Sequence, residues 1–154
     1  MNRKKGIVLW MVLLILLSIS SSLSSVAAQG GDDCGCVRGT GYWKNHEWPA
    51  GTDPNSVLVG EGVTWGQALN PPPKGSPWLI LAKAYVATML NVAAGANPGC
   101  TADVTDLLIR VGTDWLHEPY AYSAHWHEGF MEDAQHLDAW NNGLLPGVPS
   151  CPDA

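Results

Sequence analysis

The residues best suited to chemistry lie in the C-terminal quarter of the chain, where two histidines and two glutamates recur at helical spacing. Intervals of three, four and four positions separate His125, Glu128, Glu132 and His136. On an α-helix these residues therefore form one polar stripe about 80° wide. Imidazole and carboxylate groups on successive turns can bind zinc, copper or another divalent ion, although only two or three of these four could reach one ion. The alternative, which we favour, is a solvated face of an acidic helix.

A second candidate is the aromatic segment 41–49, GYWKNHEWP. Tyr42, Trp43 and Trp48 could stack on sugars or apolar partners, while Asn45 and His46 supply directional hydrogen bonds. The structural alternative is that the polar side chains cap nearby backbone groups while the tryptophans fill the core, and we favour it because buried polar groups of a loop must find partners. The segment has no clean period, which indicates an ordered loop or a short turn of helix.

Four cysteines provide the third kind of chemistry: Cys34, Cys36, Cys100 and Cys151. An even number in an exported chain predicts two disulfides, with three possible pairings. Pairing Cys34 with Cys36 would close a very small, strained ring and ranks last. Either remaining pairing ties the start of the domain to Cys100 and Cys151. A zinc site is the less favoured use, because the spacing lacks the paired cysteines of structural zinc sites.

Common catalytic motifs are missing from the sequence. It has no Gly-x-Ser-x-Gly and no His-Glu-x-x-His, and four paired cysteines would leave no thiol nucleophile. We therefore expect a non-catalytic protein without a cofactor, with a divalent ion at the histidine–glutamate stripe as the alternative.

Three helices are expected to position these residues. The clearest begins after Ser76, a good N-cap, has Pro77 at its first position and is almost wholly apolar up to Ala94, where Gly95 can end it. A helix that is apolar nearly all round lies at the centre of a domain. The second is expected over residues 102–118 and the third over 123–141. The buried stripe of the second would contain Val104, Leu107, Leu108, Val111 and Trp115.

A small β-hairpin is expected where residues 57–59 and 63–65, both rich in β-branched side chains, flank Gly60-Glu61-Gly62. The predicted fold class is therefore mainly α: about three core helices with a small β-hairpin, stapled by two disulfides.

The N-terminal residues predict export. Arg3-Lys4-Lys5 precedes an 11-residue apolar run, a serine-rich stretch follows, and Val26-Ala27-Ala28 carries the small side chains that signal peptidase reads. The run is too short to span a membrane, which needs about 20 residues. We expect a signal peptide over residues 1–28, with cleavage after Ala28 or one residue earlier. A flexible lead-in over 29–35, a single domain over 36–151 and a tail over 152–154 follow.

The net charge expected for the mature chain narrows the range of partners. The mature chain would keep five Lys or Arg against 14 Asp or Glu, a formal net charge of −9. Such a surface repels phosphate backbones and anionic lipids, so we expect neither nucleic-acid binding nor electrostatic membrane binding. With the apolar run removed by cleavage, no integral membrane segment is expected.

The chain contains two specific motifs: Cys36, four residues and then 41–46, GYWKNH; and 137–143, LDAWNNG, followed by Pro146 and Cys151. Both stretches resemble the GYWKNH domain, a family without established activity. The resemblance implies an extracellular module and carries over no catalytic residue. The extra Cys34 and the His-rich third helix depart from the family pattern.

The function we expect is thus a secreted, non-catalytic structural or interaction module of the cell surface or extracellular matrix. Its partners would be other extracellular or surface proteins or a second copy of itself, with self-assembly included. The alternatives are a metal-binding protein or metal-dependent enzyme that uses the stripe, and a glycan-binding domain that uses the loop of Tyr42, Trp43 and Trp48.

Overall fold

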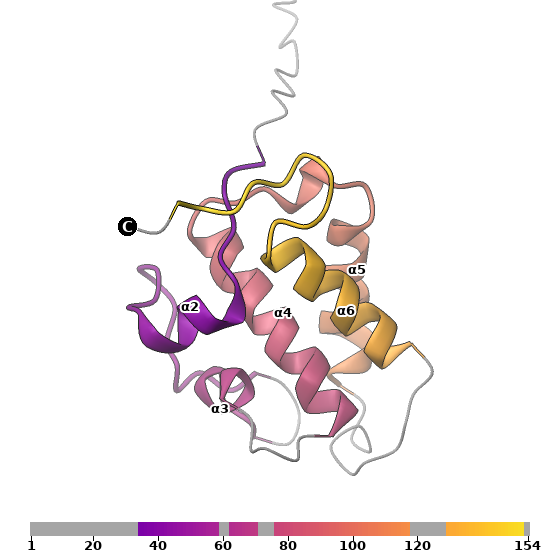
Figure 1. Ribbon diagram of the computed structural model, residues 1–154. Helices are drawn as coiled ribbons and strands as arrows, with labels where there is room; N and C mark the ends of the chain where they lie inside the picture. Colours follow the sequence, from indigo (N-terminus) through magenta and orange to yellow (C-terminus); the bar gives the residue numbers. More distant parts are fainter. Residues whose placement is uncertain (1–33, 59–61, 71–75, 118–128, 153–154) are drawn as a thin grey trace, which may run out of the picture. The chain divides into compact units, whose positions relative to one another are not determined.

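The apolar run after Ser76 forms the central helix of the fold, α4 (Pro77–Ala93) (Figure 1). The computed structural model describes residues 34–58, 62–70, 76–117 and 129–152. The Ser76 hydroxyl caps α4 by accepting a hydrogen bond from Leu79 N at 3.3 Å, and Gly95, with φ of 102°, follows its end. Both predicted helix signals of this segment are confirmed.

Helix α6 (Phe130–Asn141) packs along α4, and Figure 1 shows α4 between α2 and α6. Phe130, Leu137 and Trp140 of α6 are completely buried. Gly129, with φ of 109°, is not helical, so α6 begins at Phe130 rather than at Ser123. The predicted first turns of this helix, residues 123–128, lie outside the described residues.

The second predicted helix changes its winding part-way along. Helix α5 (Val104–Arg110) continues directly into η2 (Val111–Trp115), a π-helical segment. Gly112 of this segment lies against Tyr85 of α4, where a Cβ atom would approach the Tyr85 hydroxyl to 2.8 Å. Val104, Leu107 and Val111 are buried as predicted, Leu108 is packed at the edge of the core, and the Trp115 side chain is outside the described residues.

The predicted β-hairpin is not supported, and its residues 59–61 lie outside the described residues. Among the described residues there is no strand, only an isolated antiparallel bridge between Val57 and Thr64. The physical reason is a capping box: Thr64 Oγ1 accepts from Gln67 N at 3.2 Å, and Gln67 Oε1 accepts from Thr64 N at 2.9 Å. This box starts helix α3 (Trp65–Leu69) where the second strand would have to continue.

Two short helical pieces complete the described fold. The GYWKNH segment forms α2 (Thr40–Asn45), as the prediction of a short turn of helix required, and η1 (Pro98–Cys100) is a single 3₁₀ turn. None of the described helices combines the length and the apolar character that crossing a membrane demands. The outcome is a mainly helical domain with two disulfides.

Candidate functional site

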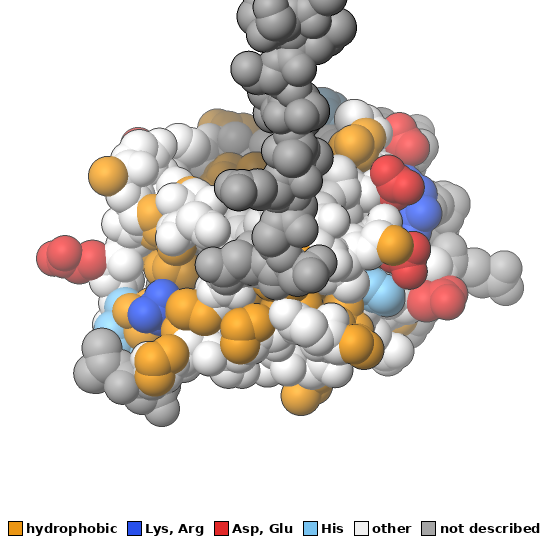
Figure 2. Space-filling model, turned by 90° about the horizontal axis from the view of Figure 1, so that it is seen from above, with side chains coloured by type: hydrophobic (Ala, Val, Ile, Leu, Met, Phe, Trp, Pro, Cys, Tyr) orange, Lys and Arg blue, Asp and Glu red, His pale blue; other side chains and the backbone are white. Residues whose placement is uncertain are grey.

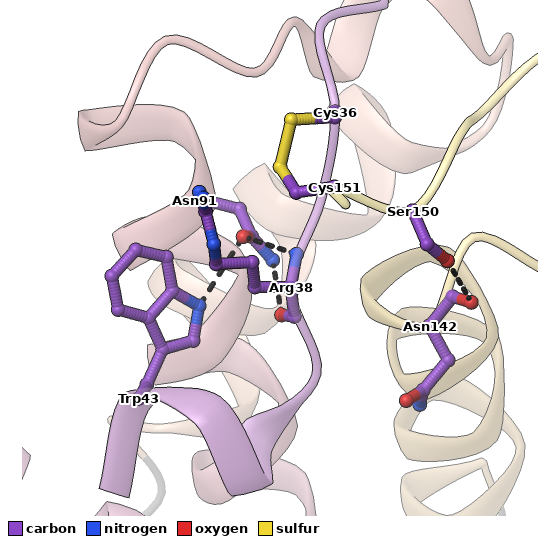
Figure 3. Close-up of a disulfide and its surroundings, with 7 residues drawn as sticks. All are labelled: Cys36, Arg38, Trp43, Asn91, Asn142, Ser150 and Cys151. Atoms are coloured by element: carbon purple, nitrogen blue, oxygen red, sulfur yellow. Dashed lines mark hydrogen bonds between the residues drawn. A yellow bond between two sulfur atoms is a disulfide. The ribbon is translucent and has the colours of Figure 1, made fainter. Parts of the chain in front are cut away.

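Both ends of the domain meet in a structure that we call the terminal clasp, formed by residues 34–38 and 149–151 (Figure 3). Cys34 is joined to Cys100 and Cys36 to Cys151, so the two predicted disulfides are present and their pairing is resolved. Between them, Val37 N donates to Pro149 O at 3.0 Å and Cys151 N donates to Val37 O at 2.9 Å. The clasp therefore holds the domain's first and last segments together by covalent and hydrogen bonds.

Asn91 of α4 anchors the clasp to the core. Its Oδ1 accepts hydrogen bonds from Arg38 N at 2.8 Å and from Trp43 Nε1 at 3.2 Å. Its Nδ2 donates to Arg38 O at 2.9 Å and to Asn141 Oδ1 at 2.9 Å. Figure 3 shows the three of these bonds that join Asn91 to Arg38 and Trp43. The amide is 1% exposed and uses two acceptor and two donor positions, so its hydrogen-bonding capacity is filled.

The same network reaches α6. Asn141 is completely buried and donates from Nδ2 to Ala84 O of α4 at 3.0 Å. Two amides thus connect the N-terminal segment, α4 and α6 in one buried chain of hydrogen bonds. Sequence reasoning missed Asn91; the available signal was one amide on a helix that is apolar nearly all round.

The tryptophans of the GYWKNH segment point into this network. Trp43 is 3% exposed, so its ring offers no face to a ligand. Trp48 is half-buried and donates from Nε1 to Trp43 O at 2.9 Å, and its ring lies 6.4 Å from that of Trp65. These two predicted binding residues are used mainly in packing.

The polar residues of the segment bond to α2 itself. Asn45 Nδ2 donates to Gly41 O at 2.9 Å, and His46 Nδ1 lies 2.9 Å from Tyr42 O, a carbonyl that can only accept. The His46 ring stacks on Tyr42 with centroids 3.9 Å apart, and Arg38 lies 4.6 Å from the same Tyr42 centroid. Two groups so close to one ring must occupy opposite faces, so Tyr42 has no free face on which a sugar could stack.

The second polar region, which we call the acidic pocket, lies between α5 and α6. It has a volume of about 400 Å³ and contains Asp103, Asp106, Arg110, Glu132, Asp133 and His136. Figure 2 shows acidic side chains gathered on the side of the molecule that carries these helices. An ion pair spans the pocket: Arg110 Nη2 donates to Asp133 Oδ1 at 2.7 Å. This hydrogen bond raises the pKa of Arg110 above its ordinary value, so the guanidinium stays charged.

The predicted metal stripe is only partly described. Glu132 and His136 both line the acidic pocket, whereas His125 and Glu128 lie outside the described residues. The Nε2 atom of His136 is buried and has no hydrogen-bond partner in the described part of the chain. In that same part, no three histidine, cysteine, aspartate or glutamate side chains are arranged to hold a metal ion. The contribution of Asp103 and Asp106 from α5 was not predicted.

Comparison with known proteins places no further constraint on this site. No protein-family model, curated protein or solved structure matches the chain. The resemblance to the GYWKNH domain therefore stays a prediction that depends on the motifs alone.

Proposed function

We propose that this chain is a secreted, non-catalytic structural or interaction module of the cell surface or extracellular matrix. The observation that carries the proposal is the pair of disulfides that begin in the terminal clasp, Cys34–Cys100 and Cys36–Cys151. Disulfides of this kind form and persist in oxidising compartments and are rare in the cytosol. They agree with the basic start, apolar run and small residues of the predicted signal peptide.

The use of the GYWKNH segment also supports a structural module. The side chains best equipped to hold a ligand, Trp43, Asn45 and His46, bond to Asn91 or to α2. A segment whose polar groups are satisfied within the fold contributes stability and a fixed surface rather than a reactive centre. Binding would then use the outer faces of the helices.

The proposal is tested by expressing the full chain in a secreting cell and analysing the exported product. We expect a product that begins at Gln29 or Ala28 by N-terminal sequencing and whose four cysteines resist alkylation until a reductant is added. The purified product is then mixed with isolated cell envelopes and matrix fractions. A chain that stays in the cytosol with free thiols contradicts the proposal, as does an exported chain that is strictly monomeric and binds none of these fractions.

Metal binding at the acidic pocket is a second candidate, favoured by the buried Nε2 atom of His136, which has no partner among the described residues, beside Glu132. Elemental analysis of the purified protein and melting curves with zinc and copper test it. His136→Gln should abolish a metal-induced rise in melting temperature, whereas His46→Gln, at an exposed histidine that follows α2, should leave it unchanged. A protein that holds no metal and melts identically with and without added ions removes this candidate.

A further inference from the structure

A groove on the other side of α6 combines an apolar floor with two charges that form no ion pair within the described residues. We call it the α4–α6 groove; it has a volume of about 180 Å³ and is lined by Ile80, Lys83 and Ala84 of α4 and by Met131, Ala134 and Asp138 of α6. Ala84 and Ala134 are buried and form the floor, while Ile80 is 40% exposed. Singly exposed apolar side chains are common, so it is the position of Ile80 beside a groove with an apolar floor, and not its exposure alone, that indicates a contact surface.

The charges of the groove lie on opposite walls. Lys83 belongs to α4 and Asp138 to α6, and within the described residues the ion pair that forms is Arg110–Asp133, not a pair with either of them. Lys83 is also one of four described cations, the others being Arg38, Lys44 and Arg110. An apolar strip with a cation on one wall and an anion on the other is complementary to a copy of itself.

We infer that the α4–α6 groove binds a second copy of this chain in a two-fold symmetric dimer. A two-fold axis along the groove places α4 of each copy over α6 of the other, so that Lys83 of one lies opposite Asp138 of its partner, twice. Ile80 of each copy then covers the alanine floor of the other. The inference rests on the proposed function and extends it by naming the partner and the surface.

The small size of the groove means that the contact must extend beyond it. Stable interfaces bury about 1,200–2,000 Å² in total, so a dimer seated on a groove of about 180 Å³ must also use the neighbouring faces of α4 and α6. We therefore expect a reversible dimer with a dissociation constant in the micromolar range, in which the two ion pairs mainly fix the orientation of the copies.

Charge reversal tests the inference on the mature, disulfide-bonded protein, with sedimentation velocity over a concentration series as the measurement. Lys83→Glu and Asp138→Lys should each weaken dimerisation at least about tenfold, because each places like charges opposite one another. The double variant should restore it. A mixture of the two single variants should form a heterodimer, since the glutamate introduced into one copy then faces the lysine introduced into the other. If Lys83 and Asp138 instead paired within one copy, mixing the two single variants would not restore dimerisation.

Substitutions at two exposed isoleucines, one beside the groove and one away from it, provide a matched control. Ile80→Glu should abolish the dimer, whereas Ile109→Glu, at a 59% exposed isoleucine of α5, should leave it intact. Far-UV circular dichroism and a thiol assay establish that every variant is folded and cross-linked. A wild-type protein that is monomeric at every concentration overturns the inference, and so does a dimer whose single variants do not rescue one another.

These outcomes separate the inference from the proposed function. A monomeric, exported protein that binds envelope or matrix material removes the dimer and leaves the proposed function standing. A protein that dimerises through this groove but is retained in the cytosol with free thiols supports the dimer and contradicts the proposed function.

Discussion

The terminal clasp and the acidic pocket both gather polar side chains, but they use them in opposite ways. Asn91 of α4, which anchors the clasp, is 1% exposed and each of its amide atoms bonds to protein. In the acidic pocket, the Arg110 side chain is 50% exposed and Asp106 and Glu132 lie at the surface, although Asp133, which pairs with Arg110, is buried. Buried polar groups cost free energy when unpaired, whereas solvated charges gain little from pairing. Stability should therefore depend on the clasp, and the pocket should be free to vary.

Removing the disulfide between the domain's ends should have the largest effect. Cys36 and Cys151 are 115 positions apart, and replacing both with serine should lower the free energy of unfolding by about 5 kcal/mol in the chain-entropy model. Cys34→Ser with Cys100→Ser, across 66 positions, should cost about 4 kcal/mol. Urea unfolding of the mature domain measures both. A loss below about 1 kcal/mol for either pair would show that the clasp is not the stabilising region.

Asn91→Ala should have the next largest effect, because it leaves buried groups of Arg38, Trp43 and Asn141 without their partner. At about 1–3 kcal/mol for each orphaned group, partly relieved by relaxation, we expect a loss of about 3–4 kcal/mol. Asn45→Ala is the control, since that exposed amide bonds only to Gly41 O and should cost less than about 1 kcal/mol. Equal losses for the two variants would contradict the contrast between buried and exposed amides.

Breaking the ion pair of the acidic pocket should matter less. Arg110→Ala removes a partner whose side chain is half exposed, but it takes this ion pair from the Asp133 carboxylate, whose side chain is 10% exposed, so we expect a loss of about 1–2 kcal/mol at low salt. The loss should shrink further in about 1 M salt, where screening acts over about 3 Å. Unfolding curves at the two salt concentrations give the answer. A loss as large as that of Asn91→Ala would erase the difference between the two regions.

The smallest effect is expected from Tyr85, which lies in neither region. Burial raises the pKa of the Tyr85 phenol above 10.0, because the charged phenolate is disfavoured away from water. Its contribution to stability is thus fully present below pH 10 and is lost as pH rises through the higher pKa of the folded state. Absorbance titration near 295 nm should show a late-ionising tyrosine that is absent from Tyr85→Phe. A titration that is the same in both proteins would refute this.

Sequence reasoning was most successful where structure depends on neighbours in the chain. Ser76, Pro77 and Gly95 predicted both ends of α4, because caps and positive φ angles are local requirements. The hairpin prediction failed for an equally local reason, since the Thr64–Gln67 capping box was not recognised.

The candidate sites depended on contacts between distant residues, which periodicity does not contain. Asn91 bonds to Arg38, 53 positions away, and no spacing rule predicts that pair. Asp103, just before α5, and His136 of α6 line the same acidic pocket, although η2 and the residues after it lie between them in the sequence. The GYWKNH segment illustrates the same point. A tryptophan suited to bind a ligand is equally suited to fill a core, and only the burial of Trp43 in the structure distinguishes the two.

The link between Cys36 and Cys151 also has a mechanical consequence. Tension applied to the chain outside these two residues passes through one covalent bond and bypasses the helices between them. The domain would transmit such a pull without extending. Reduction of this bond alone would release only the chain between Cys100 and Cys151, because the Cys34–Cys100 disulfide still bridges the part before it. In a protein exposed to shear at a cell surface, the clasp would thus serve as an inextensible joint.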